Sequence, residues 1–214
     1  MKNGLYIVST PIGNLKDISE RAIKTLTDSD FIICENPKHS LKLLLKIGIK
    51  KKLFSLHDYN EESLINKIKD NISSSIYSLI SDAGSPLISD PGYKLVRYCI
   101  SNDIFVSVVP GASSLISALQ VSSIPCNNFS FYGFFPKSDK GINDYIDKIK
   151  FSDSTSVFFI SSHKIVLVLE KLSVLLKNRK IALCKELTKI NEKKFIGFAK
   201  EILDKFKMEH KNIR

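Results

Sequence analysis

The sequence has no apolar run long enough to cross a membrane and no closely spaced pair of cysteines. Its longest apolar runs, such as 157–160 and 165–169, fall far short of the ~20 residues that a membrane span needs. No basic stretch followed by an apolar stretch of secretory-signal length opens the chain. The cysteines are widely spaced, so we expect buried thiols in a reducing compartment and no metal site. These absences predict a cytoplasmic protein that makes no use of a membrane; the cysteines are Cys34, Cys99, Cys126 and Cys184.

Standard nucleotide and hydrolase motifs are also missing. No Gly-x-Gly-x-x-Gly follows the first apolar segment, and no Walker-type Gly-Lys-Ser occurs, so ordinary dinucleotide or triphosphate binding is not expected. No serine lies in a nucleophile elbow, which argues against a Ser-His-Asp hydrolase.

Positive charge is abundant, but arginine is scarce. The net charge is +10, and apolar and charged residues make up 43% and 25% of the chain, as in a folded protein. An excess of lysine favours a polyanionic partner, because cations facing phosphates supply most non-specific nucleic-acid affinity. The chain is also rich in Ile, Asn and Ser, a bias that an AT-rich genome produces. Charge alone therefore favours RNA binding only slightly.

The first half of the chain alternates short apolar runs with longer amphipathic segments. Expected strands are 5–8, 31–34, 53–56, 76–80 and 104–108. Expected helices are 18–26, 40–47, 61–71, 93–101 and 113–120. Continuous apolar strands separated by helices are typical of a parallel sheet that is covered on both faces.

The alternation breaks at 121–128, where a proline and polar residues show no periodicity. We therefore predict two α/β domains, a first with a mainly parallel sheet over residues 1–121 and a second over residues 128–214. In the second we expect strands at 129–134, 156–160, 181–184 and 194–196 and helices at 142–150, 165–176 and 198–208.

Three loops that follow predicted strands are rich in Gly, Pro and Ser, and they span 9–14, 81–92 and 110–114. Ligands of parallel α/β sheets bind beyond the carboxyl ends of the strands, and glycine lets a backbone approach a ligand closely. A single loop of this kind is most simply an ordinary turn between a strand and a helix, in which Ser113 and Asp90 would be helix caps. Three at one sheet edge predict a binding site walled by main-chain amides.

The segments YIVSTPIGNLKDISERAIKTL, LFSLHDYNE, LISDAGSPLISDPGYKLV, VVPGASSLISAL, FYGFFPKS and KELTK occur in this order. Together they resemble the ribosomal RNA small-subunit methyltransferase I family, the 16S rRNA cytidine 2′-O-ribose methyltransferases of the tetrapyrrole-methylase fold. The resemblance implies S-adenosylmethionine bound in a cleft between two α/β domains, a homodimer, and an RNA substrate in the small ribosomal subunit. It implies no need for a metal, because the sulfonium is itself the electrophile.

The resemblance also assigns cofactor contacts to the strand-end loops. By position these are Pro11, Ile12, Asp82, Gly84, Ser85, Ser113 and Ser114, with residues 129–133, Cys184 and Lys185 closing the site from the second domain.

The chain departs from the family pattern in three segments, which begin at Glu35, Phe159 and Lys185. Two carboxylates are lost, since Asn36 stands where Asp is usual and Ile160 where Glu is usual. Lysine replaces arginine at 38, 164 and 185, and lysine offers no planar fork to phosphate or carboxylate.

Methyl transfer to a ribose hydroxyl removes one proton, and a general base contributes ~10²–10⁴-fold to such a step. Candidates for the base are Glu35, His39, His57 and Asp58, although a structural or RNA-contact role is favoured for each one taken alone. Two other functions stay open: a same-fold methyltransferase acting on a small molecule such as a tetrapyrrole, and a non-catalytic RNA-binding relative.

The resemblance carries one further expectation. The family helix that corresponds to 199–208 is followed by a Gly-Glu pair and an apolar strand that completes the second sheet. This sequence stops at Arg214 before such a strand, so we expect an incomplete second domain and impaired activity.

Overall fold

A computed structural model of the chain describes residues 1–211. It divides into two compact units, Met1–Ser114 and Leu115–Arg214, and each is described by itself. The division falls before the predicted one, because helix α5 (Ser114–Val121) groups with the second unit. The predicted end of the second domain at Arg214 lies outside the described residues.

The first unit contains a five-stranded parallel sheet with the order β3-β2-β4-β1-β5. The strands are β1 (Gly4–Val8), β2 (Phe31–Cys34), β3 (Lys52–Ser55), β4 (Ile76–Ile80) and β5 (Val106–Val109). Because every pair is parallel, all five carboxyl ends meet at one edge of the sheet. This confirms the predicted α/β class and brings the loops after β4, β1 and β5 next to one another.

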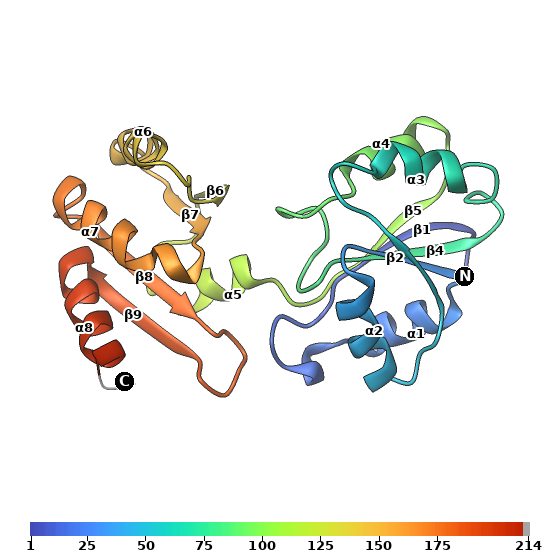
Figure 1. The fold of residues 1–214 in the computed structure, drawn as a ribbon, viewed down its shortest axis with the longest axis horizontal. Coiled ribbons are helices and arrows are strands. Elements are labelled where there is room, and N and C mark those ends of the chain that lie inside the picture. Colours follow the sequence, from blue (N-terminus) through green and yellow to red (C-terminus); the bar gives the residue numbers. More distant parts are fainter. Residues whose placement is uncertain (212–214) are drawn as a thin grey trace. The chain divides into compact units, whose positions relative to one another are not determined.

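Helices cover both faces of this sheet (Figure 1). Strand side chains alternate, so that Leu5 and Tyr77 pack against α3 (Glu61–Ile68) and α4 (Tyr93–Ser101). Tyr6, Ile32 and Ile80 pack on the opposite face against α1 (Glu20–Asp28) and α2 (Pro37–Lys46). The connections after β1 and β4 therefore leave toward opposite faces of the sheet, an arrangement that opens a ligand-binding crevice in such folds.

Local capping explains where the observed helices differ from the predicted ones. Helix α1 starts at Glu20 because the Ser19 hydroxyl accepts a hydrogen bond from the Ala22 amide at 3.1 Å. Helix α2 starts before the predicted position, since the Asn36 side chain caps it and Pro37 occupies its first turn. Strand β5 starts later than predicted, because the Ile104 amide donates to the Cys99 carbonyl at the end of α4.

The second unit contains two small sheets. Strands β6 (Phe129–Phe134) and β7 (Thr155–Phe159) pair in parallel, and β8 (Lys180–Lys185) and β9 (Lys193–Phe198) form an antiparallel hairpin. Its helices are α5, α6 (Asp139–Lys150), α7 (Ile165–Leu175) and α8 (Ala199–Lys211). Short 3-10 turns occur in both units, at Leu15–Asp17 in the first and at Ser162–Lys164 in the second. Among residues 1–211, no helix combines the length and the apolar character of a membrane span.

The thiols do not all behave as predicted. Cys34 and Cys99 are buried, and burial raises the pKa of Cys99 to about 11, so that this thiol stays protonated near neutral pH. Cys184 is half-buried, and burial raises its pKa as well. The expectation of a buried side chain is wrong for Cys126, which is exposed because it lies in the irregular segment between α5 and β6.

Candidate functional site

The three strand-end loops of the first unit are joined by direct hydrogen bonds. Thr10 and Gly84 pair as an antiparallel bridge, in which the Thr10 amide donates to the Gly84 carbonyl at 2.8 Å and the reverse bond is 3.0 Å. The Ser9 and Ser85 hydroxyl oxygens are 3.0 Å apart, and the Ser85 hydroxyl donates to the Ala112 carbonyl at 3.4 Å. The loops at 9–14, 81–92 and 110–114 therefore meet at one edge, as predicted.

Two glycines allow this close packing of backbones. A side chain at Gly111 would place its Cβ 3.0 Å from the Cβ of Ser9. Gly84 has a φ of +86°, and a Cβ there would lie 3.3 Å from Ile12 Cγ2. The glycines thus let the three loops approach one another closely, and a binding site walled by main-chain amides stays a prediction.

Asp82 presents a buried oxygen to this edge. Its Oδ1 is buried and has no hydrogen-bond partner among the described residues. A buried carboxylate oxygen without a donor is costly, because it has lost water and gained nothing in exchange. Such an atom fits a ligand that offers a hydroxyl or amino donor.

Other carboxylates surround Asp82. Burial raises the pKa of Glu35, and repulsion from Asp82, Asp90 and Asp58 raises it further. Burial also raises the pKa of Asp90, and repulsion from Asp82 raises it further. The Ser81 hydroxyl lowers this pKa, but by less than burial raises it. The ends of β2, β3 and β4 thus form a region of negative potential, which favours a positively charged ligand.

This charge crowding has a consequence for stability. Because the pKa of Asp90 is higher in the folded than in the unfolded chain, the folded state binds more protons between the two values, and stability falls as the pH rises through that range. At pH values below the ordinary carboxyl pKa, we expect Asp90→Asn and the wild type to have the same melting temperature. At pH values above the raised pKa of Asp90, we expect Asp90→Asn to have the higher melting temperature. Thermal unfolding across this pH range checks the expectation, and an Asp90→Asn protein that is less stable at neutral pH contradicts it.

All four candidates for the base, Glu35 among them, have exposed side chains. His39 lies in the first turn of α2, where its amide donates to the Asn36 side chain at 3.3 Å. His57 and Asp58 follow β3, and the His57 amide donates to Asn60 Oδ1 at 2.8 Å. Within residues 1–211, no three His, Cys, Asp or Glu side chains are grouped so that they could hold a metal ion.

The predicted cofactor contacts divide between the two units. Pro11, Ile12 and Ser113 are half-buried in the joined loops, and Ser114 begins α5. Lys185 instead ends β8 in the second unit, where its Nζ lies 5.8 Å from the centre of the Phe206 ring. The structure therefore places the predicted residues of the first unit in or next to the joined loops, and cofactor contact stays a prediction for all of them, Lys185 included.

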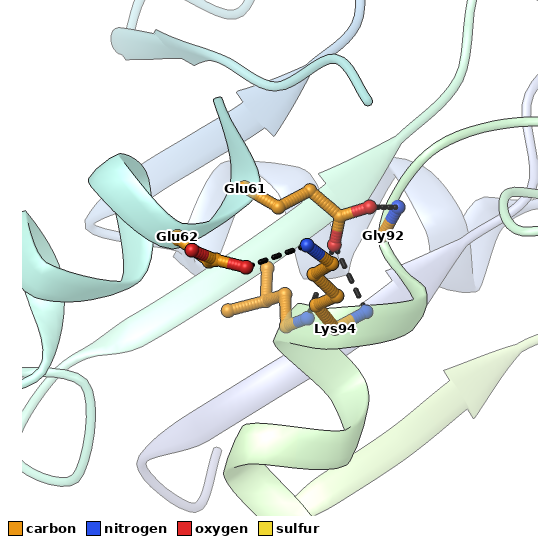
Figure 2. Close-up of polar contacts among 5 residues, drawn as sticks. Glu61, Glu62, Gly92 and Lys94 are labelled. Carbon is orange, nitrogen blue, oxygen red and sulfur yellow. Dashed lines mark hydrogen bonds and ion pairs between the residues drawn. The ribbon is translucent and has the colours of Figure 1, made fainter. Parts of the chain in front are cut away.

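Sequence reasoning missed Glu61. This residue opens α3, and its buried carboxylate accepts hydrogen bonds from main-chain amides at the start of α4, as Figure 2 shows. The sequence carries no local signal for these contacts, because the bonded residues are more than thirty positions apart. The only hint is that Glu61 closes the motif LFSLHDYNE.

A family model and curated relatives match almost the whole chain. The model of tetrapyrrole (corrin/porphyrin) methylases matches residues 4–203. Ribosomal RNA small subunit methyltransferase I of Rickettsia prowazekii is 43% identical over 211 residues, which cover 97% of this chain and 74% of that protein. The chain belongs to the ribosomal RNA small subunit methyltransferase I family of tetrapyrrole methylases. The resemblance found in the sequence is thereby confirmed.

Other members of the small subunit methyltransferase I family differ in how much of their length this chain spans. The Thermotoga maritima protein is 37% identical over 203 residues, covering 94% of this chain and 91% of its own. The Haemophilus influenzae protein is 45% identical over 190 residues, covering 86% of this chain and 66% of its own.

Solved methylase structures share the fold. A crystal structure of diphthine synthase matches with a TM-score of 0.70 at 15% identity, covering 94% of this chain and 83% of that one. Uroporphyrin-III C-methyltransferase from Thermus thermophilus, complexed with S-adenosylhomocysteine, matches with a TM-score of 0.62 at 14% identity over 94% and 86% of the two chains. At such low identity these matches concern the fold alone, and they confirm the predicted fold class.

Proposed function

We propose that this protein transfers a methyl group from S-adenosylmethionine to the 2′-hydroxyl of a cytidine ribose in 16S rRNA. The observation that carries the proposal is the junction of three hydrogen-bonded loops beside the unpartnered Asp82 oxygen, in a chain whose relatives are named ribosomal RNA small subunit methyltransferase I. The proposal includes a cytoplasmic location, where small ribosomal subunits are found, and a homodimer, as the family resemblance implies.

The residues present fit the cofactor. S-adenosylmethionine offers ribose hydroxyl and amino donors, which suit the Asp82 Oδ1 atom, and its positive charge suits the surrounding carboxylates. Gly84 and Gly111 lack a Cβ where one would lie 3.3 Å from Ile12 Cγ2 and 3.0 Å from Ser9 Cβ, so the loops can lie close together at this edge. When bound, the cofactor supplies an electrophilic methyl group on its sulfonium. In the first unit the residues that would line it are Pro11, Ile12, Ser85, Ser113 and Ser114, and a contact from Lys185 is an expectation of the family resemblance.

Glu35 is the best-supported general base. A carboxylate whose pKa is raised holds a proton more strongly than an ordinary one, and so it accepts a hydroxyl proton more readily. Glu35 also follows β2 directly, at the edge where the three loops meet. Holding the hydroxyl in line with the methyl group accounts for much of the remaining rate.

The lysines beside β3 suit an RNA partner. Lys52 and Lys67 are exposed, and their Nζ atoms lie 5.4 and 5.3 Å from the centre of the same Phe54 ring. Two like charges held over one ring attract a phosphate more strongly than either does alone. Lys50 and Lys51 continue this basic run along the chain.

Transfer of a labelled methyl group to small ribosomal subunits that lack the modification tests the proposal. We expect label on one cytidine ribose of 16S rRNA, with transfer that falls as salt rises because phosphate contacts are lost. Methylation of a free tetrapyrrole, with none on subunits, would assign the enzyme to a small-molecule substrate. Cofactor and subunit binding without any transfer would mark it as a non-catalytic RNA-binding relative.

A further inference from the structure

Glu61 caps a helix to which it is not adjacent in sequence. Its Oε1 accepts from the Gly92 amide at 3.1 Å, and its Oε2 accepts from the Lys94 amide at 2.9 Å and the Leu95 amide at 3.2 Å (Figure 2). Amides in the first turn of a helix have no partner within the helix, and Gly92 has no side chain that could bond them. The Glu61 carboxylate, only 6% exposed, therefore takes the role of the missing cap on α4 and complements the helix dipole.

The loop that ends at this cap is conformationally strained. Leu87 and Ser89 have φ values of +71° and +69°, a region that residues with a side chain rarely adopt. Gly92 has a φ of +127°, and a Cβ there would lie 2.9 Å from Leu79 Cδ2. Such conformations persist only where the surrounding structure fixes them. The Thr10–Gly84 bridge fixes the first part of the loop, and Glu61 fixes its last residue.

The fixed end of the loop is tied to the carboxylates of the site. Asp90 lies two positions before Gly92, in the same loop as Asp82. Its charge also raises the pKa of Glu35. A shift of Gly92 therefore moves a charge that faces both Asp82 and Glu35.

We infer that Glu61 is a positioning residue for cofactor binding: it holds the 81–92 loop in the conformation that the cofactor meets. This inference rests on the proposed function, since it takes the loop to be the cofactor site. Glu61 acts through the main chain of α4 and touches no reacting atom.

The neighbouring residue provides a matched control. Glu62 lies in the same turn of α3, but its Oε1 bonds the Lys94 side chain at 2.6 Å and leaves the main chain of α4 alone (Figure 2). This hydrogen bond lowers the pKa of Glu62 and raises that of Lys94. Because both side chains are exposed, the pair contributes little to stability. Glu61→Gln and Glu62→Gln make the same chemical change one residue apart, and only the first alters the cap.

Calorimetry with S-adenosylhomocysteine and steady-state kinetics on subunits test the inference. We expect Glu61→Gln to raise the Kd for S-adenosylhomocysteine and the KM for S-adenosylmethionine about tenfold, because the side-chain NH2 of glutamine would then face a main-chain N–H that it cannot accept from. The KM for subunits is expected to stay unchanged. Glu62→Gln is expected to stay within about twofold of the wild type.

Several outcomes would overturn the inference. A Glu61→Gln protein with a lower melting temperature but wild-type cofactor affinity would show that Glu61 caps α4 without positioning the cofactor loop. If this variant does not fold, Glu61→Asp, whose shorter side chain moves the carboxylate away from the α4 amides, takes its place, and a lower melting temperature together with wild-type cofactor affinity in that variant would be equally decisive against positioning. Failure of the proposed function looks different, because the wild-type protein itself would then bind no S-adenosylhomocysteine.

Discussion

Replacing Asp82 by alanine is expected to weaken S-adenosylhomocysteine binding by roughly 10- to 100-fold, because a hydrogen bond to a charged group contributes ~1.5–3 kcal/mol. The melting temperature is expected to stay the same or rise slightly. Asp82 Oδ1 has no partner within the described part of the chain, so its removal breaks no bond of the folded protein through that atom. The substitution also relieves repulsion of Glu35 and Asp90.

Calorimetry and thermal unfolding on the same preparations check this expectation. Asp70→Ala is a suitable control, because Asp70 is an exposed carboxylate just after α3 and outside the three loops. A parallel loss of affinity and melting temperature in Asp82→Ala would instead mark Asp82 as a structural turn residue.

Glu35→Gln is expected to lower kcat for methyl transfer by about 10²–10⁴-fold, the usual contribution of a general base. The Kd for S-adenosylhomocysteine is expected to change little, since the amide keeps the size of the side chain. His39→Gln and His57→Gln, which alter the other candidates, are expected to have smaller effects on kcat. A larger loss in either histidine variant would move the role of base away from Glu35.

The pH profile of kcat provides an independent test of the same assignment. Activity requires the ionised form of a general base, so kcat is expected to fall as the pH drops through the raised pKa of Glu35. Because Asp82 contributes to that raised pKa, Asp82→Asn is expected to move the acidic limb of the profile to lower pH. An acidic limb that is unchanged in Asp82→Asn, and still present in Glu35→Gln, would contradict the role of Glu35.

Much of the first unit could be predicted from the sequence because its signals are local. Strands 31–34 and 76–80 and helix 93–101 have the predicted bounds, since each is a short apolar run or an amphipathic segment between clear breaks. The predicted edge follows from the parallel order, because strand-end loops must then meet on one side. The bridge between Thr10 and Gly84 is one result of that geometry.

The contacts that sequence reasoning missed join residues far apart in the chain. Glu61 reads as an ordinary residue of a first helical turn, and only the packing of α3 beside α4 brings its carboxylate to Gly92. Helix α5 reads as the last helix of the first domain, yet it groups with the second unit. The roles of Pro11, Ile12, Ser113, Ser114 and Lys185 rest on the family resemblance and stay predictions.

We claim that the three joined loops of the first unit form the cofactor site, and hydrogen exchange of the wild-type protein with and without saturating S-adenosylhomocysteine checks this claim. The claim predicts slower amide exchange on ligand binding in residues 9–14, 81–92 and 110–114, because a ligand seated against main-chain amides shields them from water. Over Lys50, Lys51 and Lys52 we predict no change. Unchanged exchange in all three loops, at a concentration where calorimetry registers binding, would place the cofactor elsewhere and contradict the claim.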